Sequence, residues 1–105
     1  MSYTVRFSLT GAQMVRDIRD LRIQDVITKR AKRLENEPNK QGSPLLFEFD
    51  GYRNVRVEKE RYRIIYRVDD DETIVIVAAV GIRIDGDRDD IYEVARRLLR
   101  QGLLG

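Results

Sequence analysis

The chain has 105 residues, of which 42% are hydrophobic and 36% are charged, and its formal net charge is +2. This length is enough for one domain and too short for two, so we predict a single domain over residues 1–105. The nearly balanced charge excludes a uniformly basic nucleic-acid-binding coat, and the absence of Cys and His excludes disulfides, thiol catalysis and the usual zinc sites.

The first third of the chain predicts one strand followed by two helices. Residues 3–8 alternate in polarity, which is typical of a strand with one buried face. Thr10 and Gln13 have the spacing of a capping box, so we expect a helix there with an apolar stripe of Met14, Ile18 and Leu21. A second helical stripe ends at Pro38, which cannot continue a helix, and its apolar members are Ile23, Ile27, Ala31 and Leu34.

The middle of the chain predicts a loop and a β-hairpin. Residues 39–44 have the composition of a loop, and residues 45–51 are apolar enough for a short strand or an extended arm. Two strands, Tyr52–Val57 and Arg61–Val68, then flank a turn at residues 58–60.

The last third predicts a central strand and a final helix. Thr73–Gly81 is apolar on both faces, as expected of a strand inside a sheet. Helical spacing resumes at Ile91, and Gly102 is the expected C-terminal stop, with Leu103 and Leu104 exposed beyond it. We therefore predict an α+β fold, in which a small antiparallel β-sheet carries an N-terminal helical hairpin on one face and a C-terminal helix.

Two further patterns exclude a metal site and a membrane span. Residues 69–72 are four consecutive acids, whose carboxylates would point in alternate directions, so we interpret them as a solvated turn. No apolar run approaches the roughly 18 residues of a membrane span, and Met1–Thr10 lacks the apolar core of a signal peptide. We expect a cytoplasmic protein with no cofactor and no metal ion.

The predicted hairpin is unusually basic. Between Tyr52 and Arg67 it carries two acids against six basic residues, which are Arg53, Arg56, Lys59, Arg61, Arg63 and Arg67. Strand alternation puts Tyr62, Ile64, Tyr66 and Val68 on the core face, so Arg63 stands on the open face. Arg56 can lie beside it if the register allows, and Arg83 ends the central strand.

Two interpretations of this cluster remain open. Several guanidinium groups on one sheet face are costly without an anion, which favours a phosphate-binding role. Alternatively, each arginine is solvated or paired with a nearby acid, for which Glu48, Glu58 and Glu60 are available.

These residues resemble a known family. The strand "YRIIYRV" (Tyr62–Val68), the following "IVIVAAVGIR" that ends at Arg83, and the late tyrosine in "DIYEVARRLL" resemble the RelE/ParE superfamily of bacterial toxins, and its RelE branch in particular. The resemblance spans nearly the whole chain. It implies a RelE-like fold and a ribosome-dependent endoribonuclease, a hydrolase that inhibits translation by cutting mRNA in the A site.

The resemblance also implies a set of site residues. The catalytic positions fall on Arg63, Arg83 and Tyr92, and one of the family's two lysines falls on Arg56 while the other falls on Asn54. We expect the remaining hairpin residues to contact RNA, namely Arg53, Asn54, Lys59, Arg61 and Arg67. The insertion "DGDRDD" departs from the family pattern and places acids near the site, where they would repel phosphate: Asp85, Asp87, Asp89 and Asp90.

The chemistry that these residues suggest is metal-free cleavage by attack of the 2′-hydroxyl on its own phosphate. Arg63, Arg83 and Arg56 can stabilise the charge of the phosphorane, and Tyr92 can stack on a base or orient the nucleotide. Arginine is a poor proton acceptor because its pKa is above about 12. Lys59 and the carboxylates are therefore the candidate general bases.

Two alternative functions remain. The same fold serves ParE-like inhibitors of DNA gyrase, and a catalytically degenerate toxin would act only as an antitoxin-binding module. In each case the resemblance implies a cognate antitoxin as partner, in a hetero-oligomer that packs against the C-terminal helix. The ribonuclease hypothesis adds mRNA and the ribosome, including its 16S rRNA, as partners.

Overall fold

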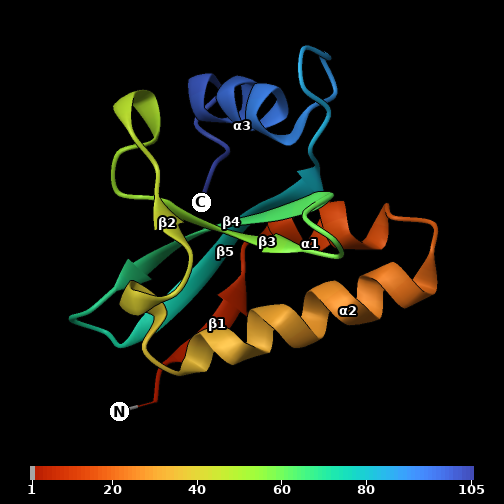
Figure 1. The fold of residues 1–105 in the computed structure, drawn as a ribbon. Helices are drawn as coiled ribbons and strands as arrows, with labels where there is room; N and C mark the ends of the chain where they lie inside the picture. Colours follow the sequence, from red (N-terminus) through yellow and green to blue (C-terminus); the bar gives the residue numbers. More distant parts are fainter. Residues whose placement is uncertain (1) are drawn as a thin grey trace.

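The structure is a computed structural model that describes residues 2–105. A five-stranded sheet in the order β1-β5-β4-β3-β2 carries helices α1 and α2 on one face and helix α3 on the other (Figure 1). The elements are β1 (Thr4–Phe7), α1 (Leu9–Arg16), α2 (Leu21–Lys32), β2 (Ser43–Pro44), β3 (Arg53–Val57), β4 (Tyr62–Asp69), β5 (Ile74–Ile82) and α3 (Ile91–Arg100). The predicted α+β class is confirmed, and within residues 2–105 no helix is long and apolar enough to cross a membrane.

The sheet is antiparallel from β2 to β5, as predicted, but β1 pairs with β5 in parallel. A parallel pair needs a long crossover connection. Here the whole chain from α1 to β4 supplies it, and β1 closes the free edge of β5. The predicted antiparallel pairing is therefore confirmed for the strands after the helices, and β1 is the exception.

The first face of the sheet holds the larger apolar core. Helix α2 buries Ile23, Ile27 and Ala31, and Leu34 follows in a short 3-10 turn, so the predicted stripe is confirmed. These side chains pack on Ile64 and Tyr66 of β4, together with Val55, Val57, Val75, Val77 and Val80.

Helix α1 begins two residues earlier than the capping box predicted. Ser8, not Thr10, is the N-cap, and its hydroxyl oxygen accepts a hydrogen bond from the Gly11 amide at 2.9 Å. Gly11 allows the helix to approach β5 closely, because a Cβ at this position would lie 2.6 Å from the carbonyl oxygen of Val77. The predicted stripe breaks at Leu21, which is 75% exposed at the start of α2.

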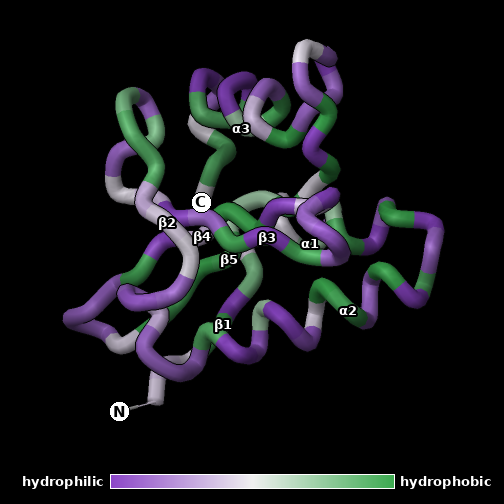
Figure 2. Tube along the Cα trace, viewed as in Figure 1, coloured by the Kyte–Doolittle hydropathy of each residue, from purple (hydrophilic) through white to green (hydrophobic). Residues whose placement is uncertain are grey.

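The second face is partly covered rather than open. Ile65, Ala78 and Ala79 of the sheet pack against Ile91 and Ala95 of α3, with Phe49 and Leu104 completing this smaller core. In Figure 2, hydrophobic and hydrophilic residues alternate along α3, as expected of a helix with one buried face. The chain turns back beyond α3, so Leu104 is buried and only Leu103 is exposed, which corrects the prediction that both are exposed.

Residues 45–51 form a loop around the 3-10 turn Phe47–Phe49, not a strand. Only Phe49 of this turn is buried, while Leu46 and Phe47 are 65% and 86% exposed. This apolar run does not form a strand, because its hydrophobic residues do not share one buried face. The loop projects beside α3 (Figure 1).

Candidate functional site

The hairpin register places two arginines side by side on the second face. Arg56 of β3 is the cross-strand partner of Arg63 of β4, and Gly81 of β5 lies on the other side of Arg63. Arg56 is exposed, whereas only 8% of the Arg63 surface is accessible. The predicted adjacency of the two guanidinium-bearing strands is therefore observed.

The hairpin turn holds both arginines. Residues 58–60 all have left-handed backbone conformations, with φ of 51°, 54° and 65°. The turn presents the Glu60 carbonyl oxygen to Nη1 of Arg63, and the Glu60 carboxylate lies 2.7 Å from Nη1 of Arg56. The hydrogen bond from Arg56 lowers the pKa of the Glu60 carboxyl. Each arginine thus keeps part of its guanidinium free for another ligand.

Arg83 follows the end of β5 and is held by two acids of the inserted loop. Its Nη1 lies 2.7 Å from Oδ1 of Asp90, and its Nη2 lies 3.4 Å from Oδ1 of Asp85. The hydrogen bond to Asp90 raises the pKa of Arg83, so the guanidinium stays charged. Asp85 is almost fully exposed, while Asp90 is buried.

Asp90 is buried but well satisfied. Its Oδ1 also accepts a hydrogen bond from the Ile84 amide at 2.7 Å, and its Oδ2 accepts one from the Tyr92 amide at 3.0 Å, which caps α3. Burial by itself raises the pKa of the Asp90 carboxyl, but the hydrogen bonds from Arg83, Ile84 and Tyr92 outweigh it, so the net pKa is lowered. The expectation that this acid faces and repels phosphate is not what the geometry shows.

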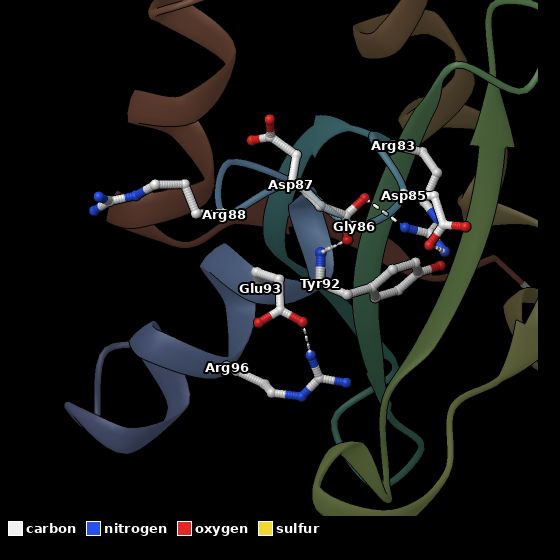
Figure 3. Close-up of a pocket in the computed structure, with 9 residues that line it drawn as sticks. Arg83, Asp85, Gly86, Asp87, Arg88, Tyr92, Glu93 and Arg96 are labelled. Atoms are coloured by element: carbon white, nitrogen blue, oxygen red, sulfur yellow. Dashed lines mark hydrogen bonds and ion pairs between the residues drawn. The ribbon is translucent and has the colours of Figure 1, made fainter.

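Tyr92 lies in the first turn of α3 and joins the arginines. The Arg83 guanidinium carbon lies 5.3 Å from the centre of the Tyr92 ring (Figure 3), a cation–π distance. The Tyr92 hydroxyl donates to Oδ1 of Asn54 at 3.3 Å. On its other side the ring contacts Phe49, with centroids 6.5 Å apart. Both the position and the tilt of the ring are therefore supported by neighbouring side chains.

These side chains surround one cleft of about 550 Å³. Four of its nine lining residues are arginines, and the full lining is Arg30, Gly42, Ser43, Asn54, Val55, Arg56, Arg63, Arg83 and Tyr92. All four predicted catalytic residues and Asn54 are thus brought together. A cleft lined by guanidinium groups and one aromatic ring suits a phosphodiester with an attached base.

A second cleft of about 490 Å³ shares Arg83 and Tyr92 with the first, and its lining residues are drawn in Figure 3. It mixes Arg88 and Arg96 with several carboxylates, which are Asp85, Asp87, Asp90 and Glu93. Arg96 already pairs with Glu48 and Glu93. Because the charges in this cleft are mutually compensated, it is a weaker candidate for a polyanion.

The other predicted RNA-binding residues lie outside the arginine cleft. Arg53 is on the first face, where it donates to the carbonyl oxygen of Gln41 at 2.8 Å. Arg67 is on the second face, but its Nε donates to the Gly105 carbonyl oxygen at 3.0 Å. Lys59 and Arg61 are exposed at the hairpin turn. Lys59, the candidate base, is therefore not part of the cleft lining.

Sequence reasoning missed four residues of the cleft lining, which are Arg30, Gly42, Ser43 and Val55. Arg30 comes from α2, and burial together with the neighbouring Arg33 lowers its pKa, so an anion nearby would stabilise its charge. Gly42 has φ of 60° and no room for a side chain, since a Cβ would lie 2.0 Å from the Asn54 carbonyl oxygen. Asp90, which the sequence analysis placed near the site as a repulsive charge, lies outside this lining. Its role as the N-cap of α3 could have been predicted from its place two residues before Tyr92 at a helix start.

Comparison with known proteins assigns the chain to a family. The family model described as "ParE toxin of type II toxin-antitoxin system, parDE" matches residues 5–85. The chain belongs to the RelE/ParE superfamily of type II toxins. This RelE/ParE toxin is 33% identical over 85 residues to Toxin RelG of Mycobacterium tuberculosis, an alignment that covers 81% of this chain and 95% of the relative.

Solved structures show the same fold. The toxin–antitoxin complex RelBE2 of M. tuberculosis contains a chain that matches this RelE/ParE toxin with a TM-score of 0.71 and 33% identity, covering 79% of this chain and all of that one. A mutant of E. coli toxin RelE in the free state matches with a TM-score of 0.70 and 20% identity, covering 93% and 99% of the two chains. The predicted RelE-like fold is thus confirmed.

Proposed function

We propose that this toxin is a ribosome-dependent mRNA endoribonuclease. The observation that carries the proposal is the cleft in which Arg56, Arg63 and Arg83 meet Tyr92. Three guanidinium groups around one space match the non-bridging oxygens of a phosphodiester, and the ring offers a surface for the adjoining base.

The reaction that fits this cleft is internal transesterification. The 2′-oxygen forms a bond to phosphorus, the bond from phosphorus to the 5′-oxygen breaks, and a 2′,3′-cyclic phosphate remains. The proton of the 2′-hydroxyl leaves to a base, and the departing 5′-oxygen receives one from an acid. Arg63 is central and mostly buried, so we assign it to the scissile phosphate, while the exposed Arg56 contacts the flanking backbone.

The arginines act by charge and position rather than as bases. A guanidinium stays protonated at neutral pH, because its pKa is above about 12. We infer that the rate comes mainly from holding mRNA in a reactive geometry within the ribosomal A site. The cleft is open to solvent along the exposed Arg56, which leaves an entry for an RNA strand.

We further propose that a cognate antitoxin binds this toxin in a hetero-oligomer. The matched M. tuberculosis structure is itself a toxin–antitoxin complex. A disordered antitoxin segment would gain most by covering apolar surface that the toxin leaves exposed. Such surface is present at Leu9, Leu21, Leu46 and Phe47.

One observation favours a second candidate, inhibition of DNA gyrase. The family model that matches residues 5–85 is that of ParE toxins. In addition, Arg56 and Arg83 already have carboxylate partners, as arginines without a phosphate ligand often do. We place the ribonuclease first because Arg63 and Tyr92 complete a cleft that surface pairing alone does not require.

The test is induced expression in a bacterial host, with growth and mRNA cut sites recorded together. The wild type should arrest growth and cut translated mRNA in the A site. Arg63→Ala should lower cutting by about 100-fold or more, the usual effect of removing one stabilising group from a transition state. Arg16→Ala is the matched control, because Arg16 lies in α1 on the opposite face and its exposed side chain donates to Oε1 of the neighbouring Gln13.

Each other outcome points to a different function. Growth arrest without mRNA cuts would contradict the ribonuclease and favour gyrase, which a supercoiling assay with purified protein would then test. No arrest by the well-folded wild type would indicate a degenerate antitoxin-binding module. Cutting at the parental rate by Arg63→Ala would remove Arg63 from the proposed site.

A further inference from the structure

Asp90 is the most completely buried charged residue of the chain from Ser2 to Gly105, with 2% of its surface exposed. A buried carboxylate is costly unless it is paired and hydrogen-bonded. Here three donors satisfy it: Nη1 of Arg83, the amide of Ile84 and the amide of Tyr92. A helix cap alone would need only the last of these.

These three donors come from two separate parts of the chain. Arg83 and Ile84 directly follow the end of β5, while Tyr92 lies in the first turn of α3. The Asp90 carboxylate therefore joins the strand end to the helix start across the inserted loop. It holds the guanidinium of Arg83 and the backbone amide of Tyr92. The Arg83 guanidinium carbon in turn lies 5.3 Å from the centre of the Tyr92 ring.

We propose that Asp90 is a positioning residue, which holds the Arg83 guanidinium against the Tyr92 ring so that both face the substrate phosphodiester. The inference rests on the proposed ribonuclease function. Asp90 does not itself line the arginine cleft, so it acts through Arg83 and Tyr92 and not by touching the RNA.

The two carboxylates on Arg83 have different roles in this scheme. Asp90 is buried and holds Nη1 at 2.7 Å, so that edge of the guanidinium is fixed. Asp85 is 95% exposed and lies 3.4 Å from Nη2, a weak and solvated contact. A phosphate oxygen can replace Asp85 at Nη2 without disturbing Asp90. The inserted loop therefore supplies one permanent partner and one exchangeable partner.

The first experiment measures single-turnover cleavage of ribosome-bound mRNA by three purified variants. Asp90→Asn keeps a helix cap but removes the charge that holds Arg83, and we expect the rate at saturating toxin to fall about 10- to 100-fold. Asp85→Asn should instead lower the toxin concentration needed for half-maximal cleavage. Asp20→Asn is the matched control, since Asp20 caps α2 by accepting from the backbone amides of Arg22 and Ile23 and holds no guanidinium among the residues that the structure describes, and its rate should equal that of the wild type.

A double-mutant cycle separates positioning from a general structural role. If Asp90 acts through Arg83, then Asp90→Asn should change the rate by no more than about twofold in an Arg83→Ala background. An equal loss in both backgrounds would overturn the proposal. So would an Asp90→Asn toxin that cuts at the wild-type rate.

A measurement on the unmodified protein tests the same inference without cleavage or substitution. In an NMR titration from pH 7 downward, the Arg83 Nε–H, the Tyr92 ring and the Asp90 carboxyl signals should shift together at one midpoint below about 3.9, the ordinary pKa of Asp. Separate midpoints would overturn the positioning role. If the wild type cuts no mRNA, the ribonuclease proposal fails, and this titration still decides whether Asp90 positions the two side chains.

Discussion

The two faces of the sheet differ in what they bury. The face under α1 and α2 is filled by aliphatic side chains and Tyr66, with Ile27, Ala31, Leu34 and Ile64 fully buried. The face under α3 has a smaller core and beside it the arginine cleft. Guanidinium groups cannot be placed inside an apolar core without an anion, so the arginines gather beside the smaller core and not within the larger one.

A single strand serves both faces. Alternate residues of β4 point to opposite sides, so Ile64 and Tyr66 enter the larger core while Arg63 and Ile65 face α3. A shift of one residue in the register would exchange the two sets. The large core therefore also determines where the arginines point, because it tolerates only one register.

The comparison predicts that the largest loss of stability comes from the first face. Ile27→Ala should lower the free energy of unfolding by about 2–5 kcal/mol, because Ile27 is fully buried and leaves a cavity. Urea denaturation measures this change. Leu21→Ala is the control on the same helix, and since Leu21 is 75% exposed its effect should stay within about 0.5 kcal/mol.

The comparison also predicts that cleavage per folded molecule is unchanged in Ile27→Ala. The helix that carries Ile27 contributes Arg30 to the cleft, but Ile27 itself is not in the lining. A specific loss of cleavage in fully folded Ile27→Ala protein would show that the two faces are not independent.

A smaller loss of stability is expected from removing the buried hydroxyl of Tyr66 on the first face. The hydroxyl of Tyr66 lies 2.9 Å from the carbonyl oxygens of Pro38 and Gln41, and burial raises its pKa. Tyr66→Phe removes the hydroxyl donor of the buried Pro38 carbonyl oxygen, while the Gln41 carbonyl oxygen keeps its hydrogen bonds from Arg53. This loss should cost about 1–3 kcal/mol in thermal or urea unfolding. Tyr3→Phe provides the contrast, because the Tyr3 hydroxyl bonds Asp70 at the exposed surface. Equal losses in the two variants would contradict the buried role of Tyr66.

The smallest effect on stability is expected at low pH, where the Asp90 carboxylate on the second face becomes protonated. The folded-state pKa of Asp90 is lowered, so its contribution to stability is complete above about pH 3.9, the unfolded value, and is lost as pH falls through the folded value. Asp90→Asn should therefore flatten the decrease in stability below about pH 4 and leave its pH dependence near pH 7 unchanged. Thermal unfolding at several pH values measures this slope, and an unaltered acid slope would show that Asp90 is not stabilised by its partners.

Part of the structure could be predicted from local sequence patterns. The stripe Ile23, Ile27, Ala31 and Leu34, the alternation of β4 and the adjacency of Arg56 to Arg63 were all predictable, because periodicity and hairpin pairing are short-range properties. Alternation also indicates that Arg53 lies on the face opposite Arg56, together with Val55 and Val57 of the larger core, although the basic run predicts that it contacts RNA.

The irregularities depended on contacts between distant segments. A β-bulge between β4 and β5 lets Val77 face the larger core while Ala78 and Ala79 both reach the smaller one, so no single period describes β5. The turn at residues 47–49 follows from Phe49 packing beneath α3. Neither feature has a local sequence signal.

The composition of the arginine cleft also depends on contacts between segments that are far apart in the sequence. By itself the sequence determined that Arg63 would stand on the face opposite the aliphatic core, because that follows from a period of two. Only the tertiary structure brought Arg30 from α2 and Tyr92 from α3 to it, and only there did Asp90 become a partner of Arg83 instead of a repulsive charge. The sign of a buried charge's effect depends on which groups surround it, and those groups come from elements that no local pattern connects.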